Sequence, residues 1–273
     1  MQTPDVLGII AGNGIYPRLL ADSARKAGVR KIIAAAFTDE THPALAQNVD
    51  LIEWMRVGQL SRLLNFFRDQ NIHHAIMAGQ IAPRNLFDLR PDWKALLLLA
   101  QLKQRNAESI FTAIADELTK VDINLLPATT FLEDSLARAG LTAGQKLSRR
   151  EEEDVALGWQ VATEIARFDI GQTVIVKNGT VLAVEAFEGT NDAIKRGGAL
   201  ARKGAVMIKV PKPNQDMRFD VPVIGAETIR VAAEVKLRVI AVAAGRTLLL
   251  ERDAIIDLAN RSNISIVARH LRT

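Results

Sequence analysis

The sequence predicts an α/β protein with two domains, the first built on a parallel sheet and the second on a mixed one. Its 273 residues exceed the usual size of a single domain. In the first half, short apolar runs alternate with segments of helical periodicity, a pattern typical of parallel sheets covered by helices. In the second half, Asn178-Gly179 between two alternating runs predicts a β-hairpin. We expect domains at 1–130 and 147–273, joined by a linker at 131–146.

The elements of the first domain follow one another in regular order. Short apolar runs predict strands, and amphipathic segments predict helices. We expect strands at Val6–Ala11, Ile32–Ala36, Leu51–Met55, His74–Ala78 and Asn124–Leu126, and helices at Pro17–Ala27, Leu60–Gln70, Trp93–Lys103 and Glu108–Lys120. This order predicts a Rossmann-like sheet, in which ligands bind beyond the carboxyl ends of the strands.

Glycine turns follow two of these strands. Gly12-Asn13-Gly14 comes directly after the first strand, and Gly79-Gln80 follows the fourth. Glycine lets backbone N–H groups approach an anion, and a helix that begins beside the turn adds a favourable dipole. Pro17 occupies the third glycine position of the dinucleotide fingerprint, so that motif is only half met. The turns predict phosphate or sugar contacts, with a purely structural βα turn as the alternative.

The second domain begins with a helix whose start is marked in the sequence. Ser148 and Glu151 form a capping box for a helix that runs to about Phe168. Periodicity and turn signals predict the rest, with strands at Thr173–Lys177, Thr180–Ala186, Ala205–Val210, Val239–Ala243, Thr247–Leu250 and Ile264–Ala268, and helices at Ala226–Lys236 and Asp253–Arg261. The segment from Pro211 to Pro222 cannot be helical, because its three prolines fix their own φ and restrict the residues before them.

Composition narrows the possible chemistry. The chain has no cysteine, which excludes thiolate nucleophiles and zinc-thiolate sites, and its four histidines lack metal-ligand spacing. Any metal must then be bound by oxygen, which favours Mg²⁺ or Mn²⁺. Aromatic residues make up only 5% of the chain, which argues against a nucleic-acid partner. The net charge of +4 suits phosphate esters or an anionic membrane surface.

No segment has the character of a membrane span or a signal peptide. Apolar runs fall short of the roughly 20 residues that cross a bilayer, and Met1–Gly14 lacks a basic start and a long apolar core. We expect a cytoplasmic protein. Leu96–Leu99 is the nearest candidate for a membrane-binding helix, but its pattern favours a buried helix instead.

Charged side chains concentrate between Val184 and Pro222, on both sides of the strand Ala205–Val210. Residues just past the end of a strand are held by the ladder and can point together into a cleft. The stretch contains the carboxylates Glu185, Glu188, Asp216 and Asp220 and the cations Lys195, Arg196, Lys209, Lys212 and Arg218. We interpret it as the active site, with a solvated charged loop as the alternative.

The order of motifs in and around this stretch resembles that of a known family. Glu188-Gly189-Thr190 precedes a basic helix start, KVPKPNQDMRFDVP follows at 209–222, and AGNG and AGQ stand at 11–14 and 78–80. With these motifs the chain resembles the LpxI-type UDP-2,3-diacylglucosamine pyrophosphatases over nearly its whole length. The resemblance implies metal-assisted cleavage of this lipid A precursor at the α-phosphorus, giving 2,3-diacylglucosamine 1-phosphate (lipid X) and UMP. It also implies a homodimer.

The resemblance assigns roles to particular residues. The family's catalytic aspartate lies in an R-x-D-x-P motif, which falls here on Arg218, Asp220 and Pro222. Asp220 and Arg218 are therefore implied as catalytic, with Asp220 either binding the metal or taking the proton of the attacking water. Asp216 and Glu185 are further candidate metal ligands. For Glu185, a structural role as a strand-end carboxylate paired with a neighbouring lysine is an equally weighted alternative. Candidate substrate-binding residues are Gly12, Asn13, Gly14, Gly79, Gln80, Glu188, Gly189, Thr190, Lys209, Lys212 and Gln215.

One departure from the family pattern concerns the metal. Relatives commonly carry aspartate after the EGT motif, whereas this chain has Asn191 followed by Asp192. If that position binds the metal, the loss of its charge should weaken the affinity.

The implied partner is an acylated UDP-sugar that is reached by a transient, peripheral contact with the inner membrane surface. We expect an acyl groove beside the phosphate site, formed in part by Pro83–Leu99, where Leu86, Phe87, Leu89 and Trp93 lack a clean helical period. One alternative is a non-catalytic protein that binds nucleotide sugars or lipid phosphates on the same fold. Another is an NAD-dependent sugar enzyme, against which stand Pro17 and the absence of a Tyr-x-x-x-Lys pair.

Overall fold

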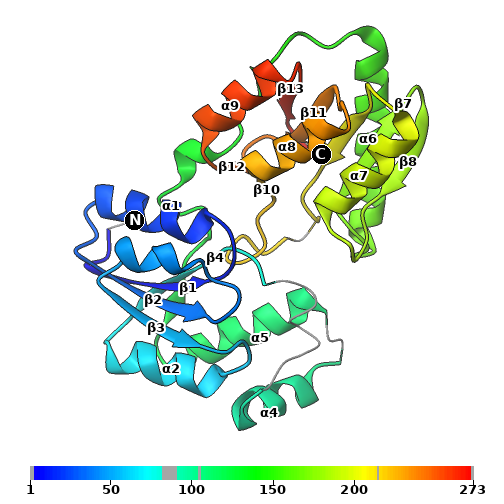
Figure 1. The fold of residues 1–273 in the computed structure, drawn as a ribbon. Coiled ribbons are helices and arrows are strands. Elements are labelled where there is room, and N and C mark those ends of the chain that lie inside the picture. The colour runs from blue at the N-terminus through cyan, green and yellow to red at the C-terminus, as the bar shows by residue number, and fades with distance from the viewer. Residues whose placement is uncertain (1–2, 82–90, 104–105, 214, 272–273) are drawn as a thin grey trace. The chain divides into compact units, whose positions relative to one another are not determined.

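The computed structural model describes residues 3–81, 91–103, 106–213 and 215–271 (Figure 1). The chain forms two compact units. The first comprises residues 1–132 together with the short segment Asp216–Asp220, and the second comprises 133–215 and 221–273. A five-residue loop from the late part of the sequence therefore folds with the first unit.

The first unit is built on a five-stranded parallel sheet in the order β3-β2-β1-β4-β5. Its strands are β1 (Val6–Ala11), β2 (Lys31–Phe37), β3 (Leu51–Met55), β4 (His74–Ala78) and β5 (Asn124–Leu125). Its helices are α1 (Tyr16–Lys26), η1 (Pro43–Gln47), α2 (Leu60–Asp69), α4 (Trp93–Gln101) and α5 (Ala107–Thr119). The predicted Rossmann-like sheet is confirmed, and the strand order reverses between β1 and β4, where such folds bind ligands.

Side chains of the sheet alternate between two buried faces, as the pleat requires. Ile10, Ile33 and Met77 lie in one core cluster with Phe67 of α2 and Leu118 of α5. The neighbouring residues Leu7 and Ile9 of β1 are also fully buried, and they point to the opposite face, where α1 packs against β1 and β4.

The second unit has a six-stranded mixed sheet in the order β6-β13-β11-β9-β7-β8. Its strands are β6 (Gly140–Ala143), β7 (Thr173–Lys177), β8 (Thr180–Val184), β9 (Val206–Lys209), β11 (Val239–Ala243) and β13 (Ser265–Arg269), and a separate parallel pair joins β10 (Val223–Ile224) to β12 (Leu248–Leu249). Strands β9, β11 and β13 run parallel, while β6, β7 and β8 pair antiparallel with their neighbours. The predicted mixed α/β architecture is confirmed.

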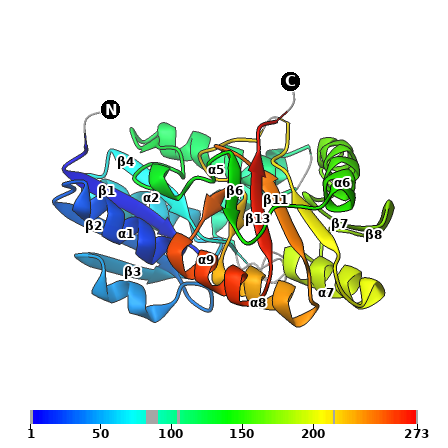
Figure 2. The ribbon, with the colours of Figure 1, turned by 90° about the horizontal axis from the view of Figure 1, so that it is seen from above.

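Helices cover both faces of this sheet. Helix α6 (Arg149–Arg167) packs on one face against Val174, Ile208 and Ala241. The other face carries α7 (Thr190–Ala201), α8 (Ala226–Glu234) and α9 (Arg252–Arg261), which lie in a row in Figure 2. Gly197 permits the close approach of α7, because a Cβ there would stand 2.6 Å from the side chain of Ile175.

Local signals in the sequence explain where α6 and the hairpin begin. The Ser148 side chain accepts from the Glu151 N–H, and the Glu151 carboxylate accepts from the Ser148 N–H, which completes the predicted capping box. The β7–β8 turn places Asn178 and Gly179 at positive φ, as Asn-Gly turns favour. The buried carboxylate of Asp154 accepts from both of their backbone N–H groups, at 2.8 and 2.7 Å.

The segment expected as a linker, 131–146, contains regular structure. It includes the 3₁₀ helix η2 (Glu133–Ser135) and β6, which pairs antiparallel with β13 at the edge of the six-stranded sheet. Only the pairing with β13 makes this short run a strand, since its own periodicity is weak.

The expectation that Leu96–Leu99 lies in a buried helix is wrong, because Leu96 and Leu97 are exposed and Leu98 and Leu99 are only partly buried. In α4 only Ala95 is buried, while Trp93, Leu96 and Leu97 are 74%, 47% and 46% exposed. Leucines occupy four successive positions of the helix and therefore point to every side of it, so the sequence does not show which of them face outward. Within the described residues, no helix is both long and apolar enough to span a bilayer.

The two predicted glycine turns meet at the point where the strand order reverses. The Asn13 N–H donates to the Gln80 carbonyl at 2.6 Å, the Gln80 N–H donates back at 3.3 Å, and the Gly12 N–H donates to the Ala78 carbonyl at 2.7 Å. A Cβ at Gly12 would lie 2.5 Å from the Gln80 carbonyl oxygen, and one at Gly79 would lie 2.5 Å from that of Asn13. Glycine is therefore required so that the two backbones can pair.

We predict that Gly12→Ala lowers the free energy of unfolding by roughly 3 kcal/mol, because the new methyl group would overlap backbone atoms that cannot move aside. Gly28→Ala is the matched control. Gly28 has φ +96° and nothing near its missing Cβ, so its substitution should cost only about 1 kcal/mol of backbone strain. Urea unfolding measures both values. Equal costs for the two variants would contradict the close-approach explanation.

Candidate active site

The loop Asp216–Asp220 is attached to the first unit by a relay of hydrogen bonds. The Ala128 N–H donates to the carbonyl of Met217 at 2.7 Å. The carbonyl of Ala128 in turn accepts from the hydroxyl of Tyr16. Tyr16 is the first residue of α1 and is only 6% exposed. Burial raises the pKa of the Tyr16 hydroxyl, so it remains a protonated donor throughout the physiological range.

Aromatic packing holds the same loop from a second side. The ring of Phe219 lies 5.7 Å from that of Phe111 on α5, centroid to centroid, and Phe219 packs against the core of the first unit. The guanidinium of Arg218 lies 5.9 Å from the centroid of the Phe219 ring, within the range of a cation–π contact. Phe219 lies between Arg218 and Asp220 in the sequence, so its packing fixes the backbone of both candidate catalytic residues.

Arg218 and Asp216 form a fork-to-fork pair. Nε of Arg218 donates to Oδ1 and Oδ2 of Asp216 at 3.0 and 3.1 Å, and Nη2 donates to Oδ2 at 2.7 Å. The hydrogen bonds from Arg218 lower the pKa of the Asp216 carboxyl. The hydrogen bonds to Asp216, and more weakly the field of Asp116 on α5, raise the pKa of Arg218. The Asp220 N–H donates to the Asp216 carbonyl at 2.9 Å, so the loop closes as a tight turn.

The candidate residues of the second unit gather around Thr190, at the start of α7. Lys209 Nζ donates to the Thr190 hydroxyl at 2.6 Å, and that hydroxyl donates to Oε1 of Glu185 at 2.8 Å. Glu185 and Lys209 are only 8% and 9% exposed. The other oxygen of Glu185 accepts from the Gln172 N–H at 3.3 Å. The hydroxyl of Thr190 therefore links a buried cation to a buried carboxylate.

The remaining motif residues of the second unit have partners of their own. Glu188 pairs with Arg196, whose hydrogen bond lowers the pKa of the Glu188 carboxyl. Gly189 precedes α7 with φ +86°. Lys212 forms an ion pair with Asp169, and its backbone N–H donates to Oε1 of Gln215 at 3.1 Å. Nε2 of Gln215 is buried and has no hydrogen-bond partner among the described residues.

The carboxylates expected to bind metal divide between the units, with Glu185 in the second and Asp216 and Asp220 in the first. Their oxygen donors suit Mg²⁺ or Mn²⁺, which commonly take one or two carboxylates and complete their shell with water and substrate phosphates. Within the part of the chain that is described, no three His, Asp or Glu side chains gather closely enough to form an all-protein site. Both oxygens of Asp216 are already engaged by Arg218, which suits an orienting partner better than a ligand.

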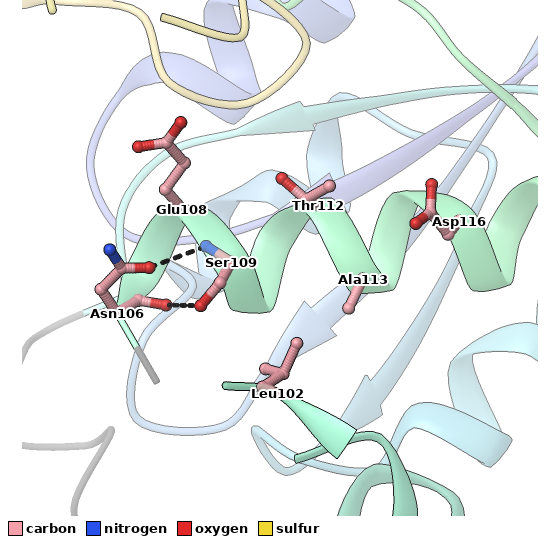
Figure 3. Close-up of a pocket in the computed structure, with 7 residues that line it drawn as sticks. All are labelled: Leu102, Asn106, Glu108, Ser109, Thr112, Ala113 and Asp116. Carbon is pink, nitrogen blue, oxygen red and sulfur yellow. Dashed lines mark hydrogen bonds between the residues drawn. The ribbon is translucent and has the colours of Figure 1, made fainter. Parts of the chain in front are cut away.

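An open pocket of about 450 Å³ runs along α5, close to Arg218 in the same unit. Glu108, Thr112 and Asp116 project from one side of the helix in Figure 3, at i, i+4 and i+8. The remaining lining residues are Leu102, Asn106, Ser109 and Ala113. Asp116, at one end of this row, is the residue whose field acts on Arg218.

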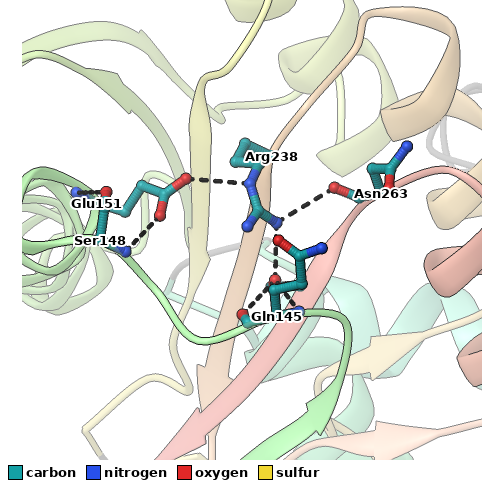
Figure 4. Close-up of polar contacts among 6 residues, drawn as sticks. Gln145, Ser148, Glu151, Arg238 and Asn263 are labelled. Carbon is teal, nitrogen blue, oxygen red and sulfur yellow. Dashed lines mark hydrogen bonds and ion pairs between the residues drawn. The ribbon is translucent and has the colours of Figure 1, made fainter.

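Arg238 is one of the residues that line a second, smaller hollow of about 140 Å³ in the second unit, and Figure 4 shows its polar contacts. Arg238 Nε lies 3.2 Å from Glu151, and Nη1 donates to Ser265 Oγ at 2.8 Å and to the Asn263 carbonyl at 3.2 Å. These bonds tie the start of α6 to β13. Arg238 therefore has a structural role.

Of the segment Pro83–Leu99, which we expect to form part of an acyl groove, the structure describes only residues 91–99. Leu86, Phe87 and Leu89 lie outside the described residues, whereas Trp93 is exposed on α4.

Comparison with known proteins decides the family. The model of the LpxI N-terminal domain matches residues 6–135, and that of the LpxI C-terminal domain matches residues 138–267. The chain belongs to the LpxI family. A curated relative, the UDP-2,3-diacylglucosamine pyrophosphatase LpxI of Caulobacter vibrioides, is 30% identical over 267 residues, which cover 93% of this chain and 94% of the relative. The resemblance inferred from the motifs is confirmed.

Among solved structures, the biotin carboxylase domain of Hydrogenobacter thermophilus 2-oxoglutarate carboxylase matches with a TM-score of 0.29 and 10% identity. The match covers 74% of this chain and 42% of that one. A similarity this low supports no statement about the LpxI chain.

Tyr16, Ala128 and Phe111 are not among the residues to which the LpxI motifs point, although they hold the R-x-D-x-P loop. The sequence offers one signal, since Tyr16 is the only tyrosine and directly follows the first glycine turn. Nothing local marks Ala128 or Phe111, because their roles depend on a loop about 90 to 110 positions further along the chain.

We predict that Tyr16→Phe loosens the loop, because the buried carbonyl of Ala128 loses its donor. Amide exchange at Met217–Asp220 should accelerate roughly tenfold, which corresponds to about 1.4 kcal/mol of lost protection. Thr163→Val is the matched control, since it removes a hydroxyl that donates at 2.8 Å to the Trp159 carbonyl within α6. Unchanged loop exchange in Tyr16→Phe would show that the Tyr16 hydrogen bond does not hold the loop.

We also predict that the carboxyl of Asp216 titrates below its ordinary pKa of 3.8. Because the folded pKa is lowered, the pair with Arg218 stabilises the loop at neutral pH, and this contribution is lost as the pH falls through the folded pKa. Carboxyl-carbon NMR would measure the titration. Arg218→Gln should return the pKa of Asp216 toward 3.8. A wild-type value at or above 3.8 would mean that the pair does not form in solution.

Proposed function

We propose that this chain hydrolyses the pyrophosphate bond of UDP-2,3-diacylglucosamine to 2,3-diacylglucosamine 1-phosphate and UMP, by metal-assisted attack of water at the α-phosphorus. The observation that carries the proposal is the match to both LpxI domains in succession, together with a relative named for this activity that aligns along 93% of the chain. Arg218, Asp220 and Pro222 keep the motif that turnover requires. On this basis the chain is a hydrolase.

The reaction requires that charge on the phosphoryl oxygens be neutralised and that a water be presented in line with the leaving group. Arg218 suits the first task because its planar fork matches two phosphate oxygens. Asp216 occupies the Nε and Nη2 edge of the guanidinium, so a phosphate would meet the edge that carries Nη1. Asp216 thereby orients Arg218 before substrate arrives.

Asp220 is the proposed catalytic carboxylate. It either takes the proton of the attacking water or binds Mg²⁺ (or Mn²⁺), while Asp216 orients Arg218. When bound, the cation would neutralise phosphoryl oxygens and acidify the water. Packing of Phe219 against Phe111 and the turn from Asp216 hold the backbone of Asp220, which reduces the reorganisation needed for either role.

The motif residues of the second unit are proposed to bind substrate phosphate or sugar. Lys209 and Thr190 present an ammonium and a hydroxyl at the start of α7, where the helix dipole also favours an anion. Glu188, Gly189, Lys212 and Gln215 are proposed to contribute to the same binding. The glycine turns Gly12–Gly14 and Gly79-Gln80 of the first unit are proposed, separately, to contact substrate phosphate or sugar. Asn191, in place of the family's aspartate, should weaken metal binding if that position is a ligand.

The alternative is a non-catalytic protein that binds nucleotide sugars or lipid phosphates. Incubation with UDP-2,3-diacylglucosamine, with and without Mg²⁺, followed by mass spectrometry of the products, separates the two. In ¹⁸O-water, attack at the α-phosphorus places the label in UMP. Binding without turnover would favour the alternative, and label in the lipid phosphate would contradict the proposed site of attack.

We further propose that the enzyme is a cytoplasmic homodimer that meets its acylated substrate by peripheral contact with the inner membrane surface. Each buried methylene of the acyl chains contributes about 0.8 kcal/mol, so an acyl-binding surface would strongly favour the lipid over UDP-N-acetylglucosamine. Similar kcat/KM values for the two substrates would contradict the lipid specificity.

We predict that Asp220→Asn lowers kcat by roughly 10² to 10⁴-fold, the usual contribution of a general acid or base, while the fold and substrate binding persist. Asp134→Asn is the matched control, because Asp134 is fully exposed and pairs only at the surface with Arg138. Steady-state kinetics and thermal unfolding of both variants provide the test. A decrease of only a few-fold in Asp220→Asn would remove Asp220 from the chemistry.

A further inference from the structure

Helix α4 presents an uncovered apolar face. Trp93, Leu96 and Leu97 occupy positions i, i+3 and i+4, which lie on one side of a helix, and they are 74%, 47% and 46% exposed. The opposite side is covered, because Ala95 and Leu98 pack into the core of the first unit. Large exposed apolar side chains that adjoin one another mark a binding surface more often than isolated ones do.

The face is held rigidly. The carboxylate of Asp92 caps α4 by accepting from the Ala95 N–H at 2.9 Å, and it also accepts from the Ser61 N–H of α2 at 2.7 Å. The Asp92 N–H donates to the Gly58 carbonyl at 3.1 Å, and α4 packs beside α2 (Figure 1). Lys94 is tied to Glu117 of α5 at 2.7 Å. The exposed face is therefore presented by a helix fixed at its start and along its side.

The sequence around the face is cationic, although α5 places the carboxylate of Glu117 against Lys94. From Trp93 to Ala107 the sequence contains no acidic residue, while Lys94, Lys103 and Arg105 are cationic. The nearest acidic group on the amino-terminal side, Asp92, is engaged by two backbone N–H groups. A tryptophan at the start of an apolar face that adjoins lysines is typical of helices that lie in the interface of an anionic bilayer.

We propose that the face formed by Trp93, Leu96 and Leu97 docks the protein on an anionic phospholipid surface. The inference rests on the proposed function at one point, which is that an acylated substrate requires contact with a membrane. The choice of this surface rests on the exposure of its side chains and the charges in the sequence around it. A second copy of the chain fits less well. A helix of nine residues is about 14 Å long, and its single face is far smaller than the roughly 800 Å² per partner of a stable dimer.

Cosedimentation with vesicles tests the proposal. The full-length protein should bind vesicles of phosphatidylethanolamine and phosphatidylglycerol, and should bind phosphatidylcholine vesicles more weakly. The variant Trp93→Gln/Leu96→Gln/Leu97→Gln should lose binding by on the order of tenfold or more. The matched control is Phe168→Gln/Leu200→Gln, which removes apolar side chains that are 76% and 64% exposed in the second unit and should bind as wild type does.

Three results would overturn the proposal. The first is unchanged vesicle binding by the α4 variant, and the second is an equal loss of binding in the control variant. The third is a smaller oligomer of the α4 variant, measured by light scattering without lipid, which would make the face an interface between copies.

Hydrolysis of detergent-dispersed substrate separates this inference from the proposed function. An α4 variant that keeps kcat on dispersed substrate but loses activity on vesicles supports docking, whereas a wild type inactive on dispersed substrate refutes the function and leaves the vesicle result to decide docking alone.

Discussion

The candidate active site depends on one buried hydrogen bond, which the Tyr16 hydroxyl donates to the carbonyl of Ala128. Tyr16 cannot leave its O–H unsatisfied in the interior, so it donates to the carbonyl of Ala128, whose own N–H donates to Met217. Three segments that are far apart in the sequence are thereby joined within one unit. The loop with Arg218 and Asp220 is consequently part of the Rossmann-like unit, although the residues on both sides of it in the sequence belong to the other unit.

Charge compensation within each cluster of candidate residues is the second organising constraint. Arg218 is paired with Asp216, Lys212 with Asp169, and Lys209 is linked through Thr190 to Glu185. A buried cation is costly without such partners, and the partners also fix its orientation. The donors of each cluster are therefore held in place by groups of the protein itself.

Close approach of backbones explains features that the sequence alone leaves ambiguous. Gly12 and Gly79 could serve either as phosphate-binding turns or as structural ones, and the pairing of Asn13 with Gln80 shows that a structural requirement exists in any case. The backbone N–H groups of Asn13 and Gln80 each donate to the carbonyl of the other residue, so both already have a hydrogen-bond partner. Gly14, in contrast to Gly12 and Gly79, has open space beside it.

The sequence by itself determined most elements of the fold, because their signals act over a few residues. The strands at Val6–Ala11, Leu51–Met55 and Thr173–Lys177, the Ser148 capping box and the Asn178-Gly179 turn all lie where periodicity and local hydrogen bonding predict them. The LpxI motifs likewise identified the family. Tertiary structure alone decided that Asp216–Asp220 joins the first unit, that β6 completes the second sheet and that α4 exposes Trp93, Leu96 and Leu97. Each of these outcomes depends on partners far away in the chain. A helix with four successive leucines or a proline-rich loop contains no local pattern that identifies those partners.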